Sequence, residues 1–299
     1  MSAENRENIW QAGKAPVAVV MISLNEGHNM EGVLENLRGW AQEVFLIDSY
    51  SRDETVSIAL RYGVRVVQRR FRGFGDQWNF ALRELPITAP WTMKHDPDER
   101  LSEKLKENII KEIQRGNCDG LIFNCRWWFM GHALPIREKV LRVWRTGSGW
   151  FSNVSVNEHV IIKGKINFVH GDMNHLDSPD IAHWLHKQNS YSTTEAINAY
   201  MQAVLTDSPN LFGSQLQRRM WMKKHFYRIP FRYTILFVYF WLWRGLWRLG
   251  RVGYMCAWLF TDAYRLVGYK LYEMESTGCL PVERMYGVGE PDQRVQQYE

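Results

Sequence analysis

Paired cysteines and a secretory leader are both missing from this sequence. Its four cysteines are scattered, and no two of them form a C-x-x-C pair; they are Cys118, Cys125, Cys256 and Cys279. A zinc site of paired cysteines is therefore not expected, and a reduced, cytosolic chain fits this usage best. The first sixteen residues, MSAENRENIWQAGKAP, are polar and hold no apolar core, so we expect no secretory signal peptide.

Long apolar runs are missing as well. The region from 214 to 273 is dense in aromatic residues, yet its two longest uncharged runs, Tyr233–Trp243 and Val252–Thr261, hold only eleven and ten residues. A helix that crosses a bilayer needs about 20 apolar residues. We therefore expect no membrane-spanning helix in this region.

Positive charge and aromatic side chains are plentiful. The net charge is +5, the pI is about 9.0, and 14 of the 299 residues are tryptophan. A basic balance favours anionic partners such as nucleic acid, phosphorylated substrates or acidic lipid. The apolar share of 45% is enough to bury a sizeable core, and the length suits one large domain or a domain with an appendage.

Residues 16–125 alternate between short apolar runs and amphipathic helical patterns. The runs at 17–22 and 43–48 predict buried strands, and the patterns at 28–40 and 102–116 predict helices. This alternation indicates an α/β fold with a largely parallel sheet. The following residues, up to about 205, predict an extension of the sheet with loops, and then a helix from Ile181 onward.

Polar side chains follow each of the first four predicted strands. They are Asn25, Asp48, the segment 69–75 and Asp96. Ligands bind at the carboxyl ends of the strands in such sheets, so we expect these residues to lie on one ligand-binding rim.

The stretch MKHDPDERL, residues 93–101, brings acids close together on this rim. Pro97 favours an extended conformation at Asp96, which precedes it. Asp96 and Asp98 can then offer carboxylates to Mg²⁺ or Mn²⁺, which prefer one or two carboxylates together with phosphate oxygens. The alternative is a helix N-terminus, where acids favour the helix dipole.

Four loops on the rim share a wider pattern: ISLNEGHN, LIDSYSRDET, RRFRGFGDQWNFAL and KHDPDER. In this order and spacing they resemble the family 2 glycosyltransferases of the GT-A fold, above all bacterial enzymes that build lipopolysaccharide cores and other surface glycans. The likeness covers residues 16–200. Four positions depart from the family pattern. Leu24 replaces the usual Lys, Tyr50 the usual Gly, Arg52 the usual Thr and Pro97 the usual Ala.

The resemblance implies a metal-dependent inverting glycosyltransferase. It would move a hexose from a nucleotide-diphosphate sugar, UDP-linked in our expectation, to a lipid-linked bacterial glycan such as lipopolysaccharide core or an O-antigen or capsule precursor. The donor-site residues that it implies are Asn25, Glu26, Asp48, Asp53, Arg72, Gln77, Asn79 and Asp96. Read alone, Asp48 and Asp53 are equally consistent with turn or helix caps, and Arg72, Gln77 and Asn79 with solvated or capping side chains.

The resemblance also places the catalytic base in the second half of the domain. Here SVNEHVII offers Glu158, whose alternative is a surface strand acid; Asp172 and Asp177 are the next candidates for a base. His175 matches a family histidine and is expected to complete a Mn²⁺ or Mg²⁺ site with Asp98 and Asp96. His170 competes with His175 for that place.

Residues 214–275 are basic and aromatic. Arg244, Arg248 and Arg251 recur at spacings of four and three, which predicts one helical face with tryptophan and leucine between them. This makeup is typical of a helix lying in the headgroup layer of an anionic membrane. The alternative is a packed helical subdomain or a homo-oligomer interface rich in tryptophan.

The expected organisation combines these parts. It has an N-terminal tail at 1–15, a GT-A domain at 16–205 divided at 125, a helical membrane-association region at 214–275 and a C-terminal tail at 276–299. We expect a peripheral enzyme on the cytoplasmic face of the bacterial inner membrane. A non-catalytic sugar-nucleotide-binding scaffold is the alternative; a nucleic-acid-binding protein is disfavoured by the acids on the rim.

Overall fold

The computed structural model describes residues 9–152, 160–201, 210–213, 217–218, 221, 225–226, 229–281 and 288–298. They fall into two compact units. Among the described residues, the first unit holds 9–127, 137–152, 160–177 and 288–298, and the second holds 128–136 and the rest between 178 and 281.

A nine-stranded mixed sheet crosses the first unit, in the order β11-β3-β2-β1-β4-β7-β6-β10-β5. Its first half is parallel: β1 pairs with β2 and β4, and β2 pairs with β3. The bounds of these strands are Ala15–Ser23 for β1, Ala41–Asp48 for β2, Arg65–Arg69 for β3 and Trp91–Lys94 for β4. The predicted α/β fold with a largely parallel first half is confirmed.

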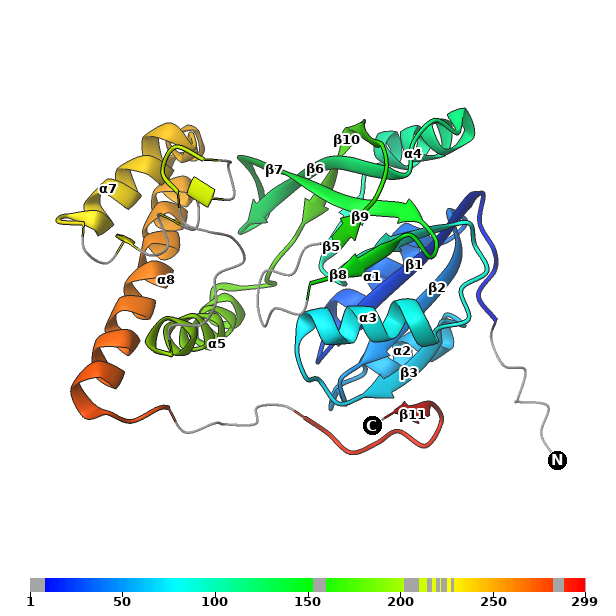
Figure 1. Cartoon of the computed structure of the whole chain (residues 1–299), viewed down its shortest axis with the longest axis horizontal. Coiled ribbons are helices and arrows are strands. Elements are labelled where there is room, and N and C mark those ends of the chain that lie inside the picture. Colours follow the sequence, from blue (N-terminus) through cyan, green and yellow to red (C-terminus); the bar gives the residue numbers. More distant parts are fainter. Residues whose placement is uncertain are drawn as a thin grey trace. The chain divides into compact units, whose positions relative to one another are not determined.

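Helices cover both faces of the parallel strands (Figure 1). They are α1 (Gly27–Leu37), α2 (Thr55–Arg61), α3 (Phe74–Glu84) and α4 (Glu103–Arg115). Helix α4 begins and ends as its sequence predicts, since the Ser102 hydroxyl accepts from the Leu105 amide and Gly116 takes a φ of 67°.

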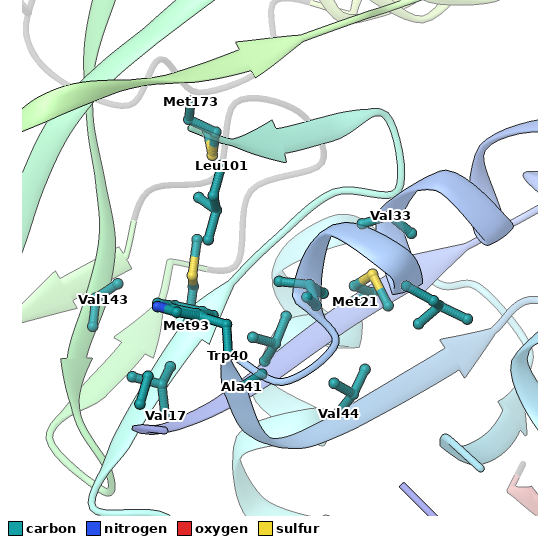
Figure 2. Close-up of a cluster of buried hydrophobic side chains, with 14 of the residues drawn as sticks. Val17, Met21, Val33, Trp40, Ala41, Val44, Met93, Leu101, Val143 and Met173 are labelled. Carbon is teal, nitrogen blue, oxygen red and sulfur yellow. The ribbon is translucent and has the colours of Figure 1, made fainter. Parts of the chain in front are cut away.

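The alternation of side chains along β1 divides the core into two layers. Val17, Val19 and Met21 pack in one cluster with residues of α1, α2 and α4, whereas Ala18 and Val20 pack in another with residues of α3. Figure 2 shows side chains of the first cluster gathered from distant parts of the chain. Both faces of β1 are thus buried, which explains its unbroken apolar run.

The second half of the sheet is mixed. The long strands β6 (Gly120–Phe129), β7 (His132–Arg145) and β10 (Ile166–His175) extend it, and the short β5 (Glu99–Leu101) closes it by pairing antiparallel with β10. A separate pair of short strands, β8 (Gly149–Phe151) and β9 (Val160–Ile162), is antiparallel. The extension of the sheet was predicted; β5, with only three residues, was not.

The second unit is mostly helical in its described part, apart from the ends of β6 and β7 within 128–136. It contains α5 (Ile181–Tyr200), α7 (Arg232–Val238), a π-helical turn η2 (Tyr239–Trp243), a 3-10 turn η3 (Leu246–Leu249) and α8 (Gly250–Thr277). A helix from Ile181 and a C-terminal helical region were both predicted and are confirmed.

The prediction of a single helical face for the three arginines near 250 is wrong. Gly245 and Gly250 take φ values of 77° and 53°, which breaks the helix on both sides of η3. Arg244 therefore follows η2, Arg248 lies in η3 and Arg251 is the second residue of α8. Spacings of four and three residues place side chains on one face only within a continuous helix, and the positive φ values of these two glycines interrupt it.

The last described residues return to the first unit. β11 (Gln296–Tyr298) pairs parallel with β3 at the edge of the sheet. Of the two units, the second contains both α5 and α8, and the first contains the sheet together with residues 288–298.

A bulge in β10 generates the first testable prediction. The register of β10 against β6 shifts between Phe168 and Asp172, and Gly171 there has a φ of 133°. A Cβ on Gly171 would lie 2.7 Å from the Cα of Leu105. Gly171→Ala should therefore lower the free energy of unfolding by about 2 kcal/mol or more, measured by urea denaturation.

Gly39→Ala is the matched control, because Gly39 also has a positive φ, of 69°, but no atom within 4 Å of an added Cβ. It should cost only about 1 kcal/mol. Equal losses in the two variants would contradict the close-packed bulge.

Candidate active site

The carboxyl ends of β1, β2, β3 and β4 bring the predicted rim together in the first unit. Ser23 pairs with Asp48 across β1 and β2, and Asp48 pairs with Gln68 across β2 and β3. The register of the parallel strands thus places the loops that follow them side by side.

Backbone and side-chain hydrogen bonds lock the loop after β1 to the loop after β2. Asn25, at a φ of 57°, donates its amide to the Ser51 hydroxyl at 2.7 Å, and its side-chain oxygen accepts from the Arg52 amide at 2.8 Å. The Glu26 amide donates to the Thr55 hydroxyl at 2.8 Å. Asn25 and Glu26 therefore help to shape the predicted donor loop, and direct ligand contact stays a prediction.

Asp53 joins the same two loops. Its carboxylate accepts from the Gly27 amide at 2.8 Å and from the Thr55 amide at 3.0 Å. These bonds give Asp53 the capping role that its sequence position also allowed, since a carboxylate satisfies the free amides at a helix start.

Asp48 is fully buried at the centre of this arrangement. One carboxylate oxygen accepts from the hydroxyls of Ser23 at 3.0 Å and Ser51 at 2.5 Å. The other accepts from the Ser51 amide at 2.9 Å and from the Gln68 side-chain amide at 2.8 Å. Four donors from three elements hold the loop conformation through this one carboxylate.

The loop between β3 and α3 holds the predicted amides. Gln77 is fully buried, and its oxygen accepts from the Arg69 guanidinium at 2.7 Å. Asn79 instead pairs with the backbone of Phe151, donating to its carbonyl and accepting from its amide, both at 2.9 Å. Arg72 is exposed on the loop. Gln77 thus lies at the predicted rim, bonded to Arg69 at the end of β3, whereas Asn79 binds the backbone of β8.

The acidic stretch after β4 contains a buried ion pair network. Arg142, on β7, donates to Asp96 at 3.0 Å and to Glu99 at 2.5 Å. Glu99 is fully buried, and its second oxygen accepts from the Asp96 amide at 2.9 Å. The Asp96 carboxylate, predicted as a metal ligand, is therefore held by a guanidinium of the chain.

Burial and charge shift the pKa values of these acids in opposite directions. Burial raises the pKa of Glu99 to about 7, although Arg142 acts to lower it. At Asp96, which is more exposed, burial raises the pKa but the charges of Arg142 and Lys94 outweigh it, so the pKa lies well below its usual range. Asp96 is thus held as an anion beside an acid that titrates near neutrality.

Asp98, His175 and Asp177 converge on the other side of this stretch. The His175 Nε2 lies 3.5 Å from a carboxylate oxygen of Asp98 and 3.5 Å from one of Asp177. Pairing of β5 with β10 sets Glu99 opposite His175, and the Leu176 amide donates to the Asp98 carbonyl at 2.8 Å. The imidazole also stacks on Trp127, with ring centroids 5.4 Å apart.

The charge state of His175 follows from these neighbours. Burial acts to lower the pKa of His175, but Asp98 and Asp177 raise it well above its ordinary value. Where no cation lies between the two carboxylates, an imidazolium therefore takes that place. A divalent cation would supply two positive charges between the carboxylates in place of one, and His175 would bind it as a neutral imidazole.

The donor atoms of Asp98, His175 and Asp177 lie within 4.8 Å of one another, as a metal site requires. Two carboxylates and an imidazole suit a cation of the Mn²⁺ type. A second group, Glu99, Cys125 and His175, shares the histidine, but Glu99 is bound to Arg142 and burial raises the pKa of the Cys125 thiol. The first group therefore fits a divalent cation better.

The remaining predicted residues have separate places. Glu158 lies outside the described residues. His170 is exposed and packs edge-on against Phe168, away from either group of ligands. Asp172, an alternative base, pairs with Arg137 at 3.0 Å.

Two residues of this site carried weak signals in the sequence. Arg142 lies in a strand predicted only as part of the extended sheet, and a single arginine among LRVWR does not reveal its buried partners. Asp177 was considered only as a substitute base. Its φ of 35°, rare for a residue with a side chain, accompanies its position beside His175.

Comparisons with known proteins find similar glycosyltransferases. Residues 18–156 match the family model described as Glycosyl transferase family 2. A "Lipopolysaccharide core biosynthesis glycosyltransferase LpsC" from Rhizobium meliloti (strain 1021) is 26% identical over 90% of this chain and 96% of its own length. An uncharacterised glycosyltransferase of Rickettsia prowazekii is 26% identical over 60% of this chain, which spans 66% of that protein.

One solved structure, S. aureus TarS 1–349 in complex with UDP-GlcNAc, aligns over 88% of this chain and 92% of that chain. The identity is 14% and the TM-score is 0.42.

The Arg142 network generates a prediction about pH. The folded-state pKa of Glu99, about 7, exceeds its ordinary 4.5, so ionising this acid lowers stability as the pH rises through that interval. Arg142→Met leaves two acids without their shared cation. Its loss in unfolding free energy, measured by denaturation with a chelator present, should reach about 3 kcal/mol at pH 8 and be smaller at pH 5.

Arg137→Met provides the control, because the pair of Arg137 and Asp172 is much more exposed. Its cost should stay below about 1 kcal/mol at both pH values. A loss for Arg142→Met that is equal at pH 5 and pH 8 would contradict the coupling of Arg142 to a buried titrating acid.

Proposed function

Because residues 18–156 match the model of glycosyl transferase family 2, we propose that the chain moves a hexose from a UDP-linked sugar to a lipid-linked bacterial glycan, with inversion. The chain is a glycosyltransferase, and its mixed sheet with a C-terminal helical region is the GT-A arrangement that the loops on the rim implied. Donor, acceptor and metal are the finer parts of the proposal.

One observation supports the donor chemistry above the others. Asp98, His175 and Asp177 bring two carboxylates and an imidazole to the loops at the end of the parallel strands. A nucleotide diphosphate carries its negative charge on phosphate oxygens, which a cation held by carboxylates can bind.

In this proposal Asp98, His175 and Asp177 hold Mn²⁺ or Mg²⁺, and Asp96 as a further ligand stays a prediction. When bound, the cation carries the charge that develops on the leaving nucleotide. Arg142 keeps Asp96 and Glu99 fixed beside the site, and the network around Asp48 fixes the loops that would receive the nucleoside.

The acceptor side is supported by the relative of nearly full length. The name of that protein assigns it to lipopolysaccharide core biosynthesis, so we propose an acceptor of the same class. Glu158 is the proposed base that takes the proton of the attacking hydroxyl, as in the sequence-based prediction.

Exposed aromatic and apolar side chains of the second unit support a membrane-surface role. Phe231 is the N-cap of α7, Ile235 and Val238 lie three residues apart within α7, and Leu242 follows in the π-helical turn η2. All four are exposed, as is Trp243 beside them, at 84%.

Basic residues accompany these apolar side chains. Arg248 and Arg251 follow them in the sequence and are exposed, and the Arg248 guanidinium lies over the ring of Trp247 at 5.3 Å. Such side chains can enter the headgroup layer while the arginines meet anionic lipid. From these exposed apolar and basic residues we propose a peripheral association with the cytoplasmic face of the inner membrane. Within the described ranges no helix is both long and apolar enough to cross a bilayer.

The metal proposal predicts the effect of Asp98→Asn. The amide keeps the size of the side chain but removes a negative charge from the cation, so Mn²⁺-dependent binding of UDP should fall by about tenfold or more in calorimetry. Asp172→Asn alters an acid that is paired with Arg137 and should bind UDP normally. Unchanged UDP binding by Asp98→Asn with Mn²⁺ would refute the role of Asp98.

The proposed base predicts a different pattern. Glu158→Gln removes proton acceptance without changing shape, so sugar transfer should fall about 10²–10⁴-fold while UDP affinity stays the same. Steady-state transfer assays and calorimetry on the same preparation measure the two quantities. Transfer at the wild-type rate would remove Glu158 from the mechanism.

The membrane proposal predicts salt-sensitive vesicle binding. The full chain should sediment with anionic phosphatidylglycerol vesicles more than with neutral phosphatidylcholine vesicles, and part of this binding should weaken as salt rises. Phe231→Ala combined with Trp243→Ala should reduce sedimentation severalfold. Trp150→Ala, an exposed tryptophan of the first unit, should leave it unchanged. Equal sedimentation of all three proteins would favour an oligomer interface instead.

A further inference from the structure

The segment 288–298 was predicted as a C-terminal tail, yet it contacts two of the loops that the proposed donor site uses. It lies in the first unit, and its last residues form β11 at the edge of the sheet beside β3. Most of its side chains are exposed, so it adds little to the apolar core. Its polar contacts converge on a small number of residues near Asp48.

The first contact is with the loop after β2. The Gly289 amide donates to the Tyr50 carbonyl at 2.6 Å, and the Arg52 guanidinium donates to the Val288 carbonyl. A Cβ on Gly289 would lie 3.0 Å from Arg52 Cγ and 3.1 Å from the Ser51 carbonyl oxygen. A side chain at residue 289 would make these neighbours move by a few tenths of an ångström, so glycine suits this close approach.

The second contact reaches Asp48 through Gln68. The Gln68 side-chain oxygen accepts from the Asp292 amide at 2.7 Å and from the Gln297 side-chain amide at 3.0 Å. The nitrogen of the same Gln68 amide donates to Asp48 at 2.8 Å. The two bonds from the segment fix which way the Gln68 amide points, and hence that a donor faces Asp48.

The third contact is with the end of β3. Tyr298 pairs with Arg69 in the strand register, and its ring packs edge-on against Phe80 with centroids 4.8 Å apart. The Arg69 guanidinium lies over the same Phe80 ring at 4.8 Å and donates to Gln77. The segment therefore contacts both the loop around Asp48 and Arg69, the residue that donates to Gln77.

We propose that residues 288–298 position the donor loops and so set the affinity for the nucleotide sugar. This inference rests on the proposed function, since it assumes that the nucleoside binds at the Asp48 and Gln77 loops. Gln297 and Gly289 are positioning residues, which act through Gln68 and through the backbone of Tyr50. The alternative is that β11 merely covers the edge of β3, a common function of short edge strands.

Two matched pairs of full-chain variants separate these readings. Gln297→Ala removes the bond to Gln68, whereas Gln296→Ala makes the same change at the neighbouring exposed residue of β11. Gly289→Val forces the segment away from Tyr50, whereas Glu290→Ala changes the exposed residue that follows. Each protein is assayed for donor KM, kcat, acceptor KM, UDP binding with MnCl₂ and melting temperature.

If the segment positions the donor loops, donor binding should change while kcat and acceptor KM do not. The donor KM and the UDP dissociation constant should rise about threefold or more for Gln297→Ala and about tenfold for Gly289→Val, while kcat and acceptor KM stay within about twofold. Gln296→Ala and Glu290→Ala should match the wild type. Replacement of Gln297 by Glu should not restore the affinity, because a carboxylate cannot donate to Gln68.

Two results overturn the inference, and they are distinguishable. A lower melting temperature with unchanged donor KM and UDP affinity in both Gln297→Ala and Gly289→Val leaves β11 as an edge cover only, and the proposed function stands. Failure of the wild-type chain to bind UDP with Mn²⁺ overturns the proposed donor, and this inference with it.

Discussion

Repulsion among the acids at the end of β4 is the constraint on which the site depends. Asp96, Asp98 and Glu99 lie within four residues, and Asp177 joins them from the end of β10. Arg142 balances Asp96 and Glu99 from β7, and His175 lies between Asp98 and Asp177 from β10. Because those two cationic groups come from distant strands, the acidic stretch is stable only once the second half of the sheet has formed.

The acids of residues 96–99 have two kinds of partner. Glu99 and Asp96 face the fixed charge of Arg142, which cannot leave and has no proton to give up at any physiological pH. Asp98 faces His175, whose positive charge depends on a proton that a divalent cation can replace. In the proposed function, Asp98 and His175 are on the side of the motif that binds a divalent cation for the nucleotide diphosphate.

The sequence was most informative where local chemistry decides the structure. Apolar runs and capping residues predicted β1, β2, α4 and α5, and parallel pairing then placed Asp48 and Asp96 at one rim. The resemblance of four loops added the glycosyltransferase family, which the matched family model bears out. His175 and Asp98 were predicted together, and the structure brings them within 3.5 Å, although their metal role stays a prediction.

What the sequence did not predict depends on partners far away along the chain. Arg142 and Glu99 are 43 residues apart, and Gln68 and Gln297 are 229 apart, so no local pattern records either contact. Three-residue strands such as β5 and β11 are too short to show a period. The broken helix at Gly245 and Gly250 followed from backbone conformation, which the spacing of arginines could not reveal.

The most direct measurement of the central claim is the binding of Mn²⁺ itself, followed by electron paramagnetic resonance with and without UDP. We expect one Mn²⁺ bound per chain, held more tightly when UDP is present, and lost in His175→Ala. The absence of bound Mn²⁺ in the wild-type protein with saturating UDP would contradict it, and so would undiminished binding in His175→Ala.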